Sequence, residues 1–205
     1  MDILTTHKDG ILTIEFNRPQ KKNAITAEMY GALANALIGA RENPAIRAVM
    51  IVGNRDIFTA GNDLKDFMDN PPRGDDSPVF RFLREISHAP KPLVAAVCGP
   101  AVGVGTTMLL HCDLVFAGDN AQFSLPFAQL GLVPEAASSL LLPELFGYQR
   151  AAERLLLANR LEPTKHSGWA SSTPCCLPIR WPLMRGSKRR SSQPCRRRQC
   201  EQPSA

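Results

Sequence analysis

Long hydrophobic runs are missing from this sequence, and none approaches the ~20 apolar residues that a transmembrane helix needs. The N-terminus, Met1-Asp2-Ile3-Leu4, also lacks the basic and then apolar segments of a secretory signal. These two absences argue against a membrane partner and against secretion. We therefore expect a cytoplasmic protein whose cysteines are reduced thiols.

Metal-ligand patterns are missing as well. Four of the six cysteines lie after residue 163, and neither Cys175-Cys176 nor the pair Cys195 and Cys200 has the spacing of a zinc site. His111 and Cys112 lie in an apolar stretch and are expected to belong to the core. We predict no metal site.

Positive charge is scarce in most of the chain and gathers at its end. Residues 164–205 hold nine of the 24 Lys and Arg but one of the 19 Asp and Glu, so residues 1–163 carry a net charge of −3. This tail is rich in Pro, Ser, Arg and Cys and has no helical or strand period, which predicts disorder. Its arginine runs lack the interleaved aromatic residues that stack on bases, and we expect no nucleic-acid partner.

Residues 1–163 have the pattern of an α/β core. Apolar runs predict strands at 11–16, 48–52, 92–97 and 113–117. Thr26 is placed to cap a helix that buries Met29, Leu33 and Leu37, and further helices are expected at 104–111, 136–145 and 149–157. Strands that alternate with helices in this way predict repeated ββα-like units.

Two glycine-bearing turns follow two of these strands. Residues 58–64 read Phe-Thr-Ala-Gly-Asn-Asp-Leu, and residues 99–105 read Gly-Pro-Ala-Val-Gly-Val-Gly. Each turn can aim a backbone N–H at one oxygen, and two such donors stabilise the charge that forms on a thioester carbonyl when its α-carbon loses a proton. Gly99, Gly103 and Gly105 could equally serve close packing of strand and helix. The pair predicts an enolate-forming site, with packing as the alternative.

These motifs resemble the crotonase superfamily, the enoyl-CoA hydratase and isomerase group. Residues 17–24 are similar to its first motif, 60–64 to its second and 99–105 to its third, and the resemblance covers roughly residues 1–161. It implies a spiral of repeated ββα units and an acyl-CoA thioester substrate. No separate cofactor is implied, because coenzyme A is part of the substrate. For an intact chain the resemblance also implies a homotrimer.

The resemblance also implies roles for particular residues. The backbone N–H groups of Asn62 and Val104 would form the oxyanion hole. The coenzyme A moiety would lie along Lys21, Lys22 and Ala24, and the pantetheine would lie beside Ala60. Further substrate-contacting positions are Asp63, Leu64, Gly103 and Phe127. For Asp63, a structural helix cap is the alternative.

One carboxylate remains where hydratases of this family use two. Thr107 and Phe127 stand at the two hydratase glutamate positions, so efficient water addition is not expected. Glu135 matches the single glutamate of the Δ3,Δ2-enoyl-CoA isomerase branch. Enclosure by Phe127, Leu130, Leu132 and Val133 is expected to raise its pKa. Glu135 could instead be an acid in the first turn of a helix.

The resemblance stops before the C-terminal helices of the family. Starting each codon one nucleotide earlier from His166 onward permits a family-like Gly-Val-Val-Asn-Thr-Val-Leu-Pro segment. We therefore predict a frameshift shortly before Thr164, which would leave the chain truncated and residues 164–205 out of frame. Three functions remain open: an enoyl-CoA isomerase, a hydratase or other enolate-forming CoA enzyme, and an inactive acyl-CoA-binding module.

Overall fold

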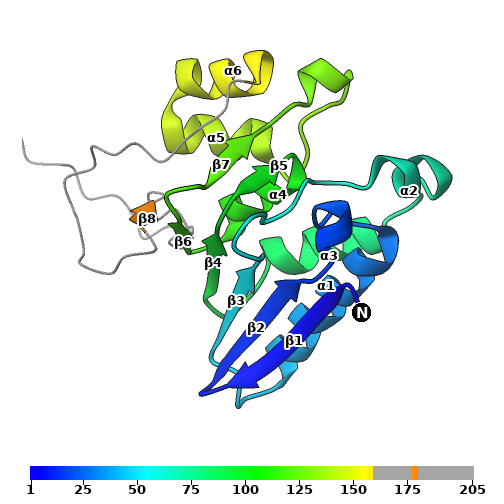
Figure 1. Ribbon diagram of the computed structural model, residues 1–205, viewed down its shortest axis with the longest axis vertical. Coiled ribbons are helices and arrows are strands. Elements are labelled where there is room, and N and C mark those ends of the chain that lie inside the picture. Colours follow the sequence, from blue (N-terminus) through cyan, green and yellow to red (C-terminus); the bar gives the residue numbers. More distant parts are fainter. Residues whose placement is uncertain (159–176, 180–205) are drawn as a thin grey trace, which may run out of the picture.

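The computed structural model describes residues 1–158 and 177–179, and its main feature is a six-stranded sheet (Figure 1). The spatial order is β1 (Ile3–Lys8), β2 (Ile11–Phe16), β3 (Ala48–Val52), β4 (Leu93–Val97), β6 (Leu114–Ala117) and β8 (Leu177–Ile179). β1 and β2 form an antiparallel hairpin, whereas β2, β3, β4 and β6 run parallel. The carboxyl ends of β3 and β4 therefore meet at one edge of the sheet, where both glycine turns begin.

A second, two-stranded sheet lies beyond that edge. It pairs β5 (Pro100–Val102) in parallel with β7 (Gln122–Ser124). β5 belongs to the second glycine turn, and its residue Ala101 forms an isolated bridge with Thr59 of the first turn. This small sheet thus holds the two turns side by side.

Helices cover the sheet and lead into the turns. They are η1 (Pro19–Lys21), α1 (Ala27–Glu42), α2 (Leu64–Asp69), α3 (Pro78–Ser87), α4 (Val104–Thr107), η2 (Met108–His111), η3 (Ala128–Leu130), α5 (Ser138–Phe146) and α6 (Tyr148–Leu157). α1 and α3 lie side by side against the sheet, while α5 and α6 lie together at the other end of the molecule (Figure 1).

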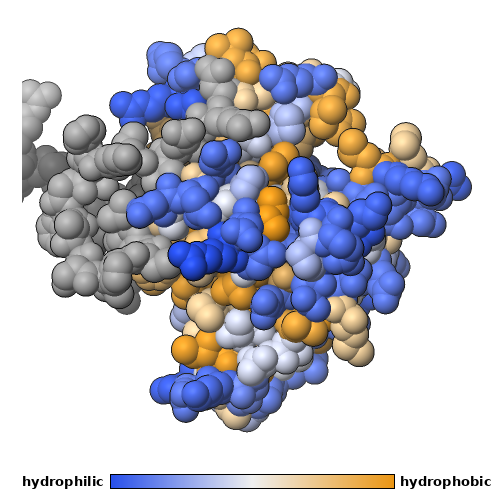
Figure 2. Space-filling model, in the orientation of Figure 1, coloured by the Kyte–Doolittle hydropathy of each residue, from blue (hydrophilic) through white to orange (hydrophobic). Residues whose placement is uncertain are grey.

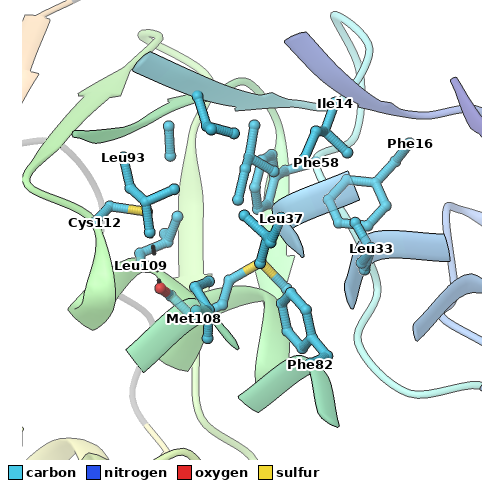
Figure 3. Packing of buried hydrophobic residues seen from close by; sticks show 14 of the residues in the cluster. Ile14, Phe16, Leu33, Leu37, Phe58, Phe82, Leu93, Met108, Leu109 and Cys112 are labelled. Carbon is cyan, nitrogen blue, oxygen red and sulfur yellow. Dashed lines mark hydrogen bonds between the residues drawn. The ribbon is translucent and has the colours of Figure 1, made fainter. Parts of the chain in front are cut away.

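The core lies between the sheet and the α1–α3 pair. α1 starts where Thr26 accepts a hydrogen bond from Met29 N, and it buries Met29, Leu33 and Leu37 as predicted. Leu33 and Leu37 pack with Phe16, Phe58 and Phe82 in Figure 3, where Phe16 and Phe58 meet edge to face at 5.4 Å. Aromatic pairs in this geometry add stability beyond the area that they bury.

Most predicted elements are confirmed within a few residues. The helix expected at 104–111 is α-helical only to Thr107 and continues as the tighter η2. The elements that were not predicted are β1, β5, β7, α2, α3 and the short η1 and η3. Of these, α3 has a clear pattern that sequence reasoning missed, since Ser77 caps it and Val79, Phe82 and Ile86 are buried at helical spacing. Cys112 is buried in the core as expected, and His111 is partly exposed.

The tail predictions are almost untested. β8 pairs with β6 along an open sheet edge, so three residues of the predicted disordered stretch form a strand. An edge strand can pair through its backbone alone and therefore needs no sequence period. The remaining residues of 164–205, with the predicted frameshift and arginine runs, lie outside the described residues.

Candidate active site

The two glycine turns contact each other directly. Val102 N donates to Thr59 O at 3.0 Å, and a Cβ built on Gly61 would lie 2.7 Å from Val102 O. Gly61 also has a φ of +88°, which side-chain-bearing residues rarely adopt. Only glycine fits at this contact. The close packing that the sequence left open for the second turn is present at Gly99 and Gly105, whereas Gly103 has open space where its Cβ would be.

Each predicted oxyanion donor directly follows a glycine: Asn62 follows Gly61, and Val104 follows Gly103. Within residues 1–158 and 177–179, neither backbone N–H donates a hydrogen bond to another described group. Gly103, with φ +55°, turns the chain into α4, and Val104 is the first residue of that helix, where an N–H has no partner in the helix. Val104 is buried and Asn62 is partly buried, so an unpaired N–H at these places favours the binding of a ligand oxygen, which stays a prediction.

Glu135 lies next to Asn62. Burial raises the pKa of the Glu135 carboxyl above its ordinary value, and a hydrogen bond with the Asn62 side chain opposes part of that rise. A carboxylate with a raised pKa is suited to accept and return a proton near neutral pH. Asn62 thus joins the predicted base to a predicted oxyanion donor.

The backbone after Glu135 argues against the helix-start alternative. α5 begins at Ser138, and no acid lies in its first turn. Between them, Ala136 and Ala137 both have positive φ, at 53° and 55°, a conformation that costs alanine about 1–2 kcal/mol per residue. A ring nitrogen of His111 lies 3.0 Å from the carbonyl of Ala136, and Ser138 N donates to Glu135 O at 3.0 Å. One local hydrogen bond and one tertiary contact, with His111, therefore hold this strained segment.

The expected apolar enclosure of Glu135 is wrong in three of its four members. Leu130, Leu132 and Val133 are exposed, because η3 and the segment after it project from the body of the chain, whereas Phe127 is buried in a small cluster with Leu125 and Leu142. Groups distant in sequence surround the carboxyl instead. Tyr30 of α1 is fully buried, donates its hydroxyl to Asn62 Oδ1, and is close enough for Glu135 to raise its pKa.

Sequence reasoning missed Tyr30. It falls within the apolar spacing of α1, so it reads as one more core residue, and no local motif marks it. Long-range contacts such as the pairing of Ile25 with Asn62 bring the start of α1 to the first glycine turn. The sequence holds no signal for this role, because the burial of Tyr30 and its place beside Asn62 follow from the packing of distant segments.

Asp63 is a structural residue, as its alternative interpretation held. It is the N-cap of α2, with its carboxylate accepting from Asp66 N at 3.3 Å, and it forms an ion pair with Arg18 at 2.8 Å. The Arg18 hydrogen bond is the largest of the influences that hold the pKa of Asp63 below its usual value. Leu64, the next residue, is exposed.

The predicted coenzyme A positions gather beside the first turn. Ala60 N donates to Lys22 O at 3.0 Å, and Ala24 O accepts from Arg18 at 2.8 Å. Lys21 and Lys22 are exposed, so both ammonium groups are free to meet a phosphate. Their contact with coenzyme A stays a prediction, as do the substrate contacts of Gly103 and Phe127.

Neither hydratase position carries a group able to activate water. The Thr107 hydroxyl is buried and donates to Val104 O at 3.4 Å, and Phe127 is apolar. Within the described ranges, no cluster of three His, Cys, Asp or Glu could hold a metal ion. In the same part of the chain, no helix is both long and apolar enough to span a membrane.

Comparison with known proteins agrees with this geometry. Residues 6–169 match the Enoyl-CoA hydratase/isomerase family. The mouse (Mus musculus) protein "Enoyl-CoA delta isomerase 3, peroxisomal" is 42% identical over 82% of this chain and 54% of its own length. Human (Homo sapiens) enoyl-CoA delta isomerase 2 is 42% identical over 78% of this chain and 42% of its own length. The chain thus spans about half the length of these curated relatives.

A solved structure shows the same fold. Pseudomonas aeruginosa OdaA superposes with a TM-score of 0.77 and 49% identity, over 78% of this chain and 65% of that one. Together with the match to more than half of the sequence, this likeness shows that the chain belongs to the enoyl-CoA hydratase/isomerase family and has the crotonase fold.

Proposed function

We propose that this chain acts on acyl-CoA thioesters as an isomerase that shifts a 3-enoyl-CoA to a 2-enoyl-CoA. One observation carries the proposal: a single carboxylate, Glu135, lies next to a residue whose backbone N–H is unpaired, at the contact of the two glycine turns. The names of the mouse and human relatives, both enoyl-CoA delta isomerases, support the same reaction class.

The proposed chemistry needs one base and two donors. The N–H groups of Asn62 and Val104 hold the thioester oxygen while Glu135 removes a proton from C2. The resulting dienolate carries its negative charge on that oxygen, where the two donors stabilise it. Glu135 then returns the proton to C4, which moves the double bond between C2 and C3. Water addition would require a second acid–base group, and Thr107 and Phe127 supply none.

Conversion of a 3-enoyl-CoA to its conjugated isomer, followed by the rise in ultraviolet absorbance, tests this proposal. We expect the chain to turn over and Glu135→Gln to lower kcat by about 10²–10⁴-fold, because glutamine cannot accept the proton. Glu144→Gln, an exposed carboxylate on α5, is the matched control and should retain full activity. Full turnover by the Glu135 variant would exclude it as the base.

An inactive acyl-CoA-binding module is the second candidate. Calorimetric binding of a CoA thioester without turnover would support this candidate, and water addition to a 2-enoyl-CoA would support a hydratase. For location we keep the cytoplasm as the prediction, with the peroxisome, named for the mouse relative, as the alternative.

A further inference from the structure

Tyr30 is a buried polar residue that the proposed reaction does not use. Only 1% of its surface is exposed, and its ring packs 5.5 Å from that of Phe82, measured between centroids. Its hydroxyl donates to Oδ1 of Asn62. A buried hydroxyl needs a hydrogen-bond partner, and this one finds it on the residue that also provides a predicted oxyanion donor.

This hydrogen bond determines which way the Asn62 amide faces. The two ends of an amide have nearly the same shape, but one accepts hydrogen bonds and the other donates them. A protonated phenol donates, so it selects Oδ1, and Nδ2 is left to face the Glu135 carboxylate. Burial, and then the charge of Glu135, raise the pKa of Tyr30 well above its ordinary value, so the phenol remains a donor at neutral pH.

Hydrogen bonds join the segment that leads into α1, which carries Tyr30, to the segment that carries Asn62. Ile25 N donates to Gly61 O at 2.8 Å, and Asp63 N donates to Ile25 O at 2.9 Å. Ala27 N, at the start of α1, donates to Asp66 Oδ2 at 2.7 Å. The start of α1 is therefore hydrogen-bonded to residues before and after Asn62.

We propose that Tyr30 is a positioning residue: by fixing the Asn62 amide, it directs a donor to the Glu135 carboxylate and so orients the base for proton transfer. The kinetic part of this inference rests on the proposed isomerase function. Asn62 would then serve two tasks with separate atoms, since its backbone N–H is left for the thioester oxygen. Tyr30 would act through Asn62 and would not itself transfer a proton.

The groups near Glu135 predict how its pKa should change when the hydrogen bond from Asn62 is lost. Tyr30 of α1 interacts electrostatically with Glu135, and the ring of His111, from η2, contacts the carbonyl of the adjacent Ala136. The third neighbour, Asn62, is neutral. A donor to the charged form of a carboxyl lowers its pKa, so loss of the Asn62 donor should raise the pKa of Glu135.

Tyr30→Phe tests the inference, because it removes the hydroxyl and keeps the ring. We expect kcat to fall about fivefold with KM within about twofold, and the low-pH limb of the kcat/KM profile to move to higher pH. Tyr148→Phe, which alters an exposed tyrosine, is the matched control and should change neither. If Tyr30 acts through Asn62, its substitution should have less than a twofold effect in an Asn62→Ala background.

Two results would overturn the inference: a Tyr30→Phe profile equal to that of Tyr148→Phe, or an undiminished effect of Tyr30→Phe in the Asn62→Ala background. Carboxyl ¹³C NMR titration of Glu135 in the unmodified chain and in Tyr30→Phe gives a readout that needs no turnover. An upward shift of the Glu135 pKa in the variant supports the inference even if the chain does not isomerise substrate. In that case only the proposed function fails.

Discussion

Glu135 shows at the scale of one residue how a catalytic requirement opposes stability. Burial disfavours its charged form, which raises its pKa in the folded chain. A carboxyl with a raised folded-state pKa binds its proton more tightly in the folded state than in the unfolded one. The contribution of Glu135 to folding stability is therefore fully present below the unfolded pKa and is lost as pH rises through the folded pKa.

Glu135→Gln should consequently be more stable than the unmodified chain at pH 7. The gain in melting temperature should disappear below about pH 4, where the carboxyl is protonated in both states. Thermal unfolding at a series of pH values measures it. Glu144→Gln should show no such pH dependence, and a constant gain for Glu135→Gln at every pH would contradict the buried-carboxylate explanation.

At the scale of elements, the second glycine turn is determined by two different constraints. A Cβ on Gly99 would lie 2.0 Å from Asp56 O, and Gly99 also has a φ of +66°. Gly103, with φ +55°, has open space where its Cβ would be. A side chain at Gly99 would therefore meet both a steric clash and an unfavourable backbone conformation. At Gly103 only the backbone conformation is unfavourable.

Alanine substitutions should separate these constraints. We expect Gly103→Ala to lower the free energy of unfolding by about 1–3 kcal/mol, the cost of a strained backbone, and Gly99→Ala to lower it by more. Gly39→Ala, inside α1 with free space around it, should instead stabilise by about 0.5–1 kcal/mol. Urea denaturation compares the three. Equal losses at Gly99 and Gly103 would mean that the contact with Asp56 does not matter.

At the scale of the whole molecule, large apolar residues gather on one end of the surface. Figure 2 shows hydrophobic residues over α5, α6 and the segment before them. The most exposed of these are Val133, Tyr148, Leu140, Leu156 and Leu157. An apolar surface of this kind promotes association between molecules.

Replacing Leu140 and Leu157 by glutamine should reduce this association. Both residues are 61% exposed, so each substitution should change the free energy of unfolding by no more than about 0.5 kcal/mol. Light scattering at increasing protein concentration should fall relative to the unmodified chain. Met68→Gln, on α2, is the control for an exposed apolar residue elsewhere. An equal reduction by the control would show that the end formed by α5 and α6 is not special.

Much of the fold could be predicted from the sequence because its signals are local. Thr26 caps α1 through a hydrogen bond to Met29, three residues away, and the apolar runs of β2, β3 and β4 mark strands by composition alone. β5 and β7, by contrast, are three residues each and pair with one another across the space between distant segments. Their pairing is a tertiary event that no short window of sequence contains.

The sequence by itself determined the glycine turns, the single carboxylate at Glu135 and the family to which the chain belongs, because motifs are written in neighbouring residues. The tertiary structure alone decided what surrounds that carboxylate. Nearby apolar residues such as Val133 turn out to be exposed, whereas Tyr30 and Asn62, about a hundred and about seventy residues away, lie beside it. Burial and hydrogen bonding depend on which distant segments the packing of the sheet brings together, and sequence spacing does not record that.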